Sequence, residues 1–128
     1  MSEEAVVRRG AEIPFRRVEA GTGTSMQVLI GASDGVPNFT MRRFVMEDEG
    51  GMPLHTNRVE HEQYVLRGRA EIRVGEELHS VSAGDVLFIP AGTPHSYRVV
   101  AAPFEFLCMV PNREDEIEIL RERKGDES

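Results

Sequence analysis

Residues 84–99 read GDVLFIPAGTPHSYRV, and this stretch decides the fold because it alternates apolar runs with turn residues. Two strands are predicted, over Val86–Ile89 and Ser96–Val100, since both segments are short, apolar and bounded by turn residues. The connection Pro90–Pro94 contains two prolines and a glycine, which end regular structure. The pattern therefore predicts strand, turn and strand, with His95 directly after the turn.

The rest of the chain repeats this pattern of short apolar segments separated by turns. Further strands are expected over Met26–Ile30, Phe39–Glu47, Glu62–Arg67, Ala70–Val74, Leu78–Val81 and Phe104–Val110. Gly50-Gly51 and Pro53 are expected to end the strand pattern, and Gly68 is expected to lie in the turn of a hairpin. Closely spaced short strands predict an all-β sandwich or barrel, and one helix is expected over Glu114–Arg123.

Length and composition fit an ordinary globular protein. The chain has 128 residues, of which 40% are hydrophobic and 29% charged, so we expect one domain. Residues 1–25 should form an N-terminal arm or edge strand, residues 26–111 a barrel, and residues 112–128 a charged C-terminal tail. The single cysteine, Cys108, permits no disulfide within the chain.

The charge balance excludes several classes of partner. The net charge of −7 argues against a nucleic-acid or membrane surface, which would need clustered Lys and Arg. The pairs Arg8-Arg9 and Arg16-Arg17 are interpreted as solvated charge. The sequence shows no apolar leader and no run long enough to span a membrane, so a cytoplasmic location is expected.

Three of the four histidines lie beside turns, and this is the main functional signal. His55 follows the Gly51–Leu54 segment, His61 opens a predicted strand, and His95 follows the Pro90–Pro94 turn. Neutral imidazole is the commonest transition-metal ligand, and three converging imidazoles leave coordination positions open. A histidine beside a turn is, however, also commonly a solvated side chain.

Two longer stretches resemble the paired motifs of the cupin superfamily. Residues 50–68, GGMPLHTNRVEHEQYVLRG, resemble the first motif: His55-Thr56-Asn57 takes the His-x-His place and His61 the usual Glu position. Residues 84–99 match the second motif in every spacing, through Gly84, Pro90, Gly92 and His95. The resemblance implies a cupin double-stranded β-helix, or jelly-roll barrel.

Three further segments, VLIG at 28–31, FTMRRF at 39–44 and FEFLCMVP at 104–111, resemble those of small bacterial manganese cupins with a histidine-rich site. This likeness implies one divalent transition metal ion per chain, and the ligands would accept Mn, Fe, Ni, Cu or Zn. His55, His61 and His95 are the expected ligands. Asn57 is a candidate fourth ligand, but its amide oxygen is weaker than imidazole, so water or substrate is expected in its place. The resemblance also implies a homodimer.

Strand alternation and the resemblance together suggest the cavity lining. If His61 and His95 point inward, then so do Gln63 and Tyr97, because side chains on one face recur every second residue. The resemblance adds inward positions for four more side chains: Phe44, Phe106, Cys108 and Val110. Cys108 could be a reactive thiol or a small core residue.

Arg42 is the candidate substrate anchor. The resemblance places it inward, where a buried guanidinium needs an anionic partner and would therefore clamp an anionic substrate. The alternative is that Arg42 reaches the rim and is solvated.

Three functions remain open from the sequence. The first is a mononuclear non-haem metal oxidoreductase of the dioxygenase kind, acting on a small chelating or anionic molecule, with Arg42 as substrate anchor and Tyr97 as proton donor. The second is a metal-dependent sugar or keto-acid isomerase, with the ion as Lewis acid. The third is a non-catalytic cupin that binds or senses a small molecule.

Overall fold

Antiparallel strands make up most of the protein. The computed structural model describes residues 4–120. Its strands are β1 (Arg16–Arg17), β2 (Thr22–Ile30), β3 (Phe39–Thr56), β4 (His61–Val74), β5 (Glu77–Ser82), β6 (Val86–Ile89), β7 (His95–Pro111) and β8 (Glu118–Ile119). Two short 3-10 turns, η1 (Gly10–Glu12) and η2 (Ala32–Asp34), are the only helical elements in the described part. The all-β prediction is confirmed.

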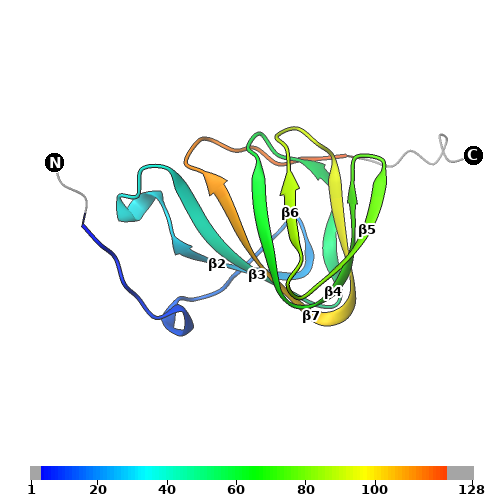
Figure 1. The fold of residues 1–128 in the computed structure, drawn as a ribbon, viewed down its shortest axis with the longest axis horizontal. Helices are drawn as coiled ribbons and strands as arrows, with labels where there is room; N and C mark the ends of the chain where they lie inside the picture. The colour runs from blue at the N-terminus through cyan, green and yellow to red at the C-terminus, as the bar shows by residue number, and fades with distance from the viewer. Residues whose placement is uncertain (1–3, 121–128) are drawn as a thin grey trace, which may run out of the picture.

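The sheet is built around three long strands. Its hydrogen-bonded order is β1-β2-β3-β7-β4-β5, with β6 added to β4 and β8 added to β3. In Figure 1, β2 and the first half of β3 lie toward one end of the molecule, and β4, β5 and β6 lie toward the other. The central strand β7 joins the two groups, because it pairs with both β3 and β4.

The expected break near residue 50 is wrong, because β3 runs through it. The register between β3 and β7 shifts between Met46 and Gly51, which marks an irregularity within the strand. Gly51 has a φ of 154°, and a Cβ there would lie 2.1 Å from the Tyr97 carbonyl oxygen. Glycine therefore allows the two backbones to approach while the strand bends instead of ending.

The expected hairpin at Gly68 is also wrong. Strand β4 continues from His61 to Val74, and its register to β7 shifts repeatedly on both sides of Gly68. Gly68 has a φ of +81°, and a Cβ there would lie 2.2 Å from the Pro103 carbonyl oxygen. The two segments predicted over 96–100 and 104–110 likewise form one strand, β7. Long bent strands, with glycine at the bends, thus replace several predicted short ones.

The helix expected over Glu114–Arg123 is not formed in its described part, and residues 121–123 lie outside the described residues. Instead, β8 pairs with the end of β3, where Ile119 lies opposite His55. The Asp115 carboxylate accepts hydrogen bonds from the backbone N–H groups of Arg58 and Glu116. Side-chain bonds of this kind compete with helix formation and hold the segment extended against the barrel.

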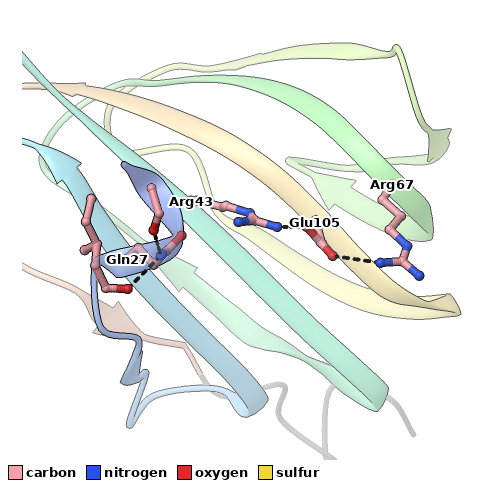
Figure 2. Close-up of polar contacts among 6 residues, drawn as sticks. Gln27, Arg43, Arg67 and Glu105 are labelled. Carbon is pink, nitrogen blue, oxygen red and sulfur yellow. Dashed lines mark hydrogen bonds and ion pairs between the residues drawn. The ribbon is translucent and has the colours of Figure 1, made fainter. Parts of the chain in front are cut away.

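The N-terminal arm is tied to β2 by a buried amide. Gln27 is 1% exposed, and its Nε2 donates hydrogen bonds of 2.8 Å to the carbonyl oxygens of Gly10 and Ile13. Figure 2 shows Gln27 with these two bonds. Arg8 adds an ion pair to Asp34 at 2.7 Å. The arm therefore follows a fixed path before it enters β1.

The core is apolar and lies between the long strands. Its fully buried members come from β3, β4 and β7, namely Met46, Val65, Ala70, Ile72, Phe104 and Cys108. Glu105 is buried as well, but its carboxylate pairs with Arg43 at 2.5 Å and Arg67 at 3.4 Å (Figure 2). Among residues 4–120, no helix is long and apolar enough to cross a membrane.

Candidate functional site

The structure brings the three predicted histidines together. His55 lies at the end of β3 and is the direct cross-strand partner of His95, the first residue of β7. The ring centroids of His55 and His95 are 4.1 Å apart, and those of His61 and His95 are 5.8 Å apart. All three side chains are at least nine-tenths buried. Residues far apart in the sequence thus form one cluster.

Two backbone carbonyls fix the tautomers of His55 and His95. The Nδ1 atom of His55 lies 2.8 Å from the Pro53 oxygen, and that of His95 lies 2.9 Å from the Thr93 oxygen. A carbonyl only accepts hydrogen bonds, so Nδ1 carries the proton and Nε2 keeps a lone pair. The Nε2 atoms of His61 and His95 are buried and have no partner within the described chain. Such atoms are costly to bury unless something binds them.

Burial keeps the imidazoles neutral. Burial lowers the pKa of His55 from its ordinary value. Burial, helped by the positive charge of Arg42, lowers the pKa of His61 to about 3. Burial and the neighbouring His55 lower the pKa of His95 to about 4. At neutral pH the rings are therefore in the deprotonated form that binds transition metals.

Asn57 is oriented by a residue that the sequence motifs do not mark. Its Nδ2 donates a hydrogen bond of 3.0 Å to Asp115 Oδ2, while its Oδ1 is buried without a partner. Asp115 also lines the same cavity as the histidines. Sequence reasoning assigned Asp115 to a charged tail, and no motif could have placed it here. The amide oxygen of Asn57 is thus left without a hydrogen-bond partner within the described chain.

The donor atoms fit a metal ion by their chemistry. Three buried, neutral imidazoles and one free amide oxygen lie in one cavity wall, which suits borderline divalent ions. Among residues 4–120, no three His, Cys, Asp or Glu side chains lie in a group that could hold a metal ion in their present positions. The fit therefore rests on the unpartnered donor atoms and not on a preset coordination geometry.

The cavity beside the histidines has a volume of about 230 Å³. Besides the histidines and Asn57, its wall contains Phe44, Phe106, Gln63, Tyr97, Cys108 and Arg42. Val110 was predicted to lie here, but it is not among the lining residues. It pairs with Thr40, beyond Met109, which is the last β7 residue that pairs with β4. The cavity has already ended at that point of the strand.

Arg42 lies in the cavity wall without a carboxylate partner. Its Nη2 donates a hydrogen bond of 3.1 Å to Cys108 Sγ, which is a weak acceptor. Its Nε is buried and unpartnered, and its guanidinium carbon lies 5.0 Å from the centroid of the Phe44 ring. Arg42 is half-buried and is among the residues that line the cavity.

Gln63 links the other polar side chains of the wall. Its Nε2 donates a hydrogen bond of 2.7 Å to Tyr97 Oη, while its Oε1 is buried without a partner. Burial raises the pKa of Tyr97, so the hydroxyl keeps its proton. Burial likewise raises the pKa of the Cys108 thiol, whose Sγ lies 3.5 Å from His61 Nδ1. Both groups are therefore neutral at physiological pH.

Comparison with known families agrees with this geometry. The model of the family described as Cupin domain matches residues 42–110, more than half of the chain, and this range includes all three histidines. The chain belongs to the cupin family. The resemblance of the two motifs is thereby confirmed, and the bent, paired strands are those of a cupin barrel.

Solved cupin structures share this fold over most of their length. The polyketide cyclase RemF from Streptomyces resistomycificus superposes with a TM-score of 0.85 at 23% identity, covering 94% of this cupin and 89% of that chain. A cupin 2 conserved barrel domain protein from Rhodopseudomonas palustris is 28% identical, with a TM-score of 0.70, and 90% of this cupin and 74% of that chain are covered.

A curated relative matches a shorter segment at higher sequence identity. Quercetin 2,3-dioxygenase from Bacillus subtilis is 46% identical over 48 residues, which are 37% of this cupin. The matched segment spans 14% of the dioxygenase.

Proposed function

We propose that this cupin is a mononuclear metal-dependent oxidoreductase, of the dioxygenase kind, that acts on a small chelating or anionic molecule. The observation that carries the proposal is the cluster of three buried, neutral histidines, two of which have unpartnered Nε2 atoms. They lie in the wall of a cavity that also contains Arg42, which has no carboxylate partner among the described residues. The segment similar to quercetin 2,3-dioxygenase supports the class of reaction.

His55, His61 and His95 would hold one divalent transition metal ion, of the Mn, Fe, Ni, Cu or Zn series. When bound, the ion would supply Lewis acidity and open positions for exogenous ligands. No carboxylate belongs to this donor set, so the site would keep the positive charge of the ion and favour anionic ligands. Asn57 Oδ1 is the available fourth donor within the described chain, and we expect water or substrate to compete with it.

The remaining wall residues bind and orient the substrate. Arg42 would pair with an anionic group, since its guanidinium has only a thiol as acceptor. Tyr97 holds its proton and is fixed by Gln63, so it would donate a hydrogen bond or a proton to a substrate oxygen. Phe44, Phe106 and Tyr97 stack in a column, with centroids 5.1 and 5.5 Å apart, and would keep water from the reacting atoms.

The alternative is a non-catalytic cupin that binds or senses a small molecule. It is favoured because, apart from the three histidines that would hold the metal, the described residues of the wall include no free general base. The one carboxylate, Asp115, is engaged by Asn57 and by backbone N–H groups. The same lack disfavours the isomerase hypothesis, because proton abstraction next to a carbonyl needs such a base.

The first test is elemental analysis of protein purified without an affinity tag. We expect one transition metal per chain in the wild type and a loss of stoichiometric metal in the His61→Ala variant, with the fold retained by circular dichroism. His79→Ala is the matched control, since His79 is exposed and its Nε2 lies 3.2 Å from the Glu77 carboxylate. Full metal retention in His61→Ala would remove His61 from the ligand set.

The second test is an oxygen-uptake screen with catechols, diketones and thiols. Oxygen uptake with a cleaved or oxygenated product supports the oxidoreductase. Saturable binding without turnover supports the binding protein. Solvent deuterium exchange without oxygen uptake would instead identify an isomerase.

A further inference from the structure

The N-terminal arm forms part of the cavity wall. Gln27 holds residues 10 and 13 through its amide, and Phe15 lies with its ring centroid 5.9 Å from the Arg43 guanidinium carbon. The chain then enters β1, which pairs with β2. Figure 2 shows Gln27 holding this arm on the same side of the sheet as Arg43. The position of β1 is therefore fixed by the buried Gln27 amide and by the contact of Phe15 with Arg43.

Strand β1 places Arg16 in the row of side chains that lines the cavity. Arg16 lies opposite Met26, Met26 lies opposite Phe44, and Phe44 lies opposite Phe106. Directly opposed residues share a face of an antiparallel sheet, and all four residues line the cavity. Arg16 is exposed, so it lies at the mouth and not in the interior.

The cavity is cationic in an acidic protein. Three arginines, Arg16, Arg17 and Arg42, line it together with one aspartate, whereas the whole chain carries a net charge of −7. Neither Arg16 nor Arg42 has an ion-pair partner among residues 4–120. By contrast, five other arginines are paired with carboxylates, namely Arg8, Arg43, Arg58, Arg67 and Arg98. The interpretation of Arg16 as merely solvated charge does not account for this placement.

We propose that the cavity binds a compact dianion, with one acidic group on Arg42 inside and the other on Arg16 at the mouth. This inference rests on the proposed function in that both use the same cavity. Arg16 on β1 and Phe44 on β3 are separated by strand β2, so they lie two strand spacings, or about 10 Å, apart across the sheet. Arg42 lies two residues from Phe44 along β3. The side chain between them is Met26, so the middle of the ligand is apolar.

The size of the cavity limits the ligand further. Its volume of about 230 Å³ is below the ~300 Å³ at which pockets for drug-sized ligands begin. A single ring or a short chain carrying two carboxylates fits this space. Benzoate and the three benzenedicarboxylates are suitable probes, because they share one apolar ring and differ in the number and the spacing of their charges.

The test is calorimetric titration of these four probes into the full chain with the metal that it retains. We expect at least one dicarboxylate to bind about fivefold tighter than benzoate, the gain typical of one partly exposed ion pair. Arg16→Gln should abolish that gain and leave benzoate affinity within twofold. Arg42→Gln should weaken benzoate and dicarboxylates alike.

Two further variants separate a directed contact from general attraction. Arg17→Gln removes the same charge one residue away. Arg17 also lines the cavity, but it pairs with Ser25, in the row of Val45 and Glu105, and not with Met26, so this variant should lower dicarboxylate affinity by less than twofold. Gln27→Leu releases the arm and should reproduce the loss seen in Arg16→Gln, without loss of benzoate binding. Circular dichroism and metal content check that each variant is folded and loaded.

The outcomes are distinguishable from those of the proposed function. Equal losses in Arg16→Gln and Arg17→Gln, or a dicarboxylate preference that survives Arg16→Gln, would overturn the second anion site, because the second carboxylate would then bind elsewhere, for instance at the metal. Failure of all four probes to bind would also overturn it. Either result with full metal content leaves the metal centre standing, whereas loss of metal in the wild type counts against the proposed function alone.

Discussion

The contact between Asn57 and Asp115 gives the sharpest prediction about the site. Asn57→Asp is nearly isosteric, but it replaces the Nδ2 donor with an oxygen about 3.0 Å from Asp115 Oδ2. Two unit charges at this distance repel by about 5 kcal/mol at an effective dielectric constant near 20. Proton uptake by one carboxyl group relieves part of this repulsion. We therefore expect the free energy of unfolding to fall by about 3–5 kcal/mol at pH 7 without metal.

The assay is urea unfolding followed by circular dichroism, with EDTA and then with saturating MnCl2. Metal should stabilise Asn57→Asp more than the wild type, because the added carboxylate lies beside the imidazole donors. Asn57→Leu is the control, since it loses the hydrogen bond without adding charge and should cost about 1–3 kcal/mol. If Asn57→Asp is more stable than Asn57→Leu in EDTA, the added charge does not face a carboxylate and the assigned contact is wrong.

Three other predictions concern the metal, the fold and the assembly. Asn57→His should raise metal affinity about tenfold, or about 1.4 kcal/mol, by equilibrium dialysis, while Asn57→Ala should change it only slightly. Gly68→Ala should lower the free energy of unfolding by more than about 3 kcal/mol, because the new Cβ meets backbone atoms, whereas Gly75→Ala, with nothing within 4 Å, should cost about 1 kcal/mol. Light scattering should give twice the chain mass of 14.3 kDa, because Val86 and Phe88 on β6 are 72% and 59% exposed and a second copy would cover them. A single-chain mass at micromolar concentration would contradict this.

The centre of the fold is predictable from the sequence because local rules decide it. The Pro90–Pro94 turn and the alternation after His61 fix where two strands begin, and hence which way their side chains point. Gly51 and Gly68 are predicted from the sequence to interrupt regular strands, and in the structure both have a positive φ. The sequence could not show whether such a glycine ends a strand or bends it, since that depends on how closely β7 approaches.

The edges of the site are not predictable in this way. Asp115 reaches the cavity because β8 pairs with β3, and this long-range pairing has no local signal. The acidic run around it favours a helix or a solvated tail on local grounds. Arg16 is similar, because its orientation depends on a two-residue strand held by a buried amide some ten residues away. Tertiary contacts here override local preference.

The two ends of the described chain form walls of the same cavity. Arg16 and Val18 on one side, and Asp115 and Ile117 on the other, line it, and all four lie outside the segment 42–110 that matches the family. The histidines lie inside that segment. Substitutions at these flanking residues can therefore alter which molecules enter the cavity, while the three histidines stay the same. Cupins with identical histidine motifs should accordingly be compared at these flanks before a shared ligand is assumed.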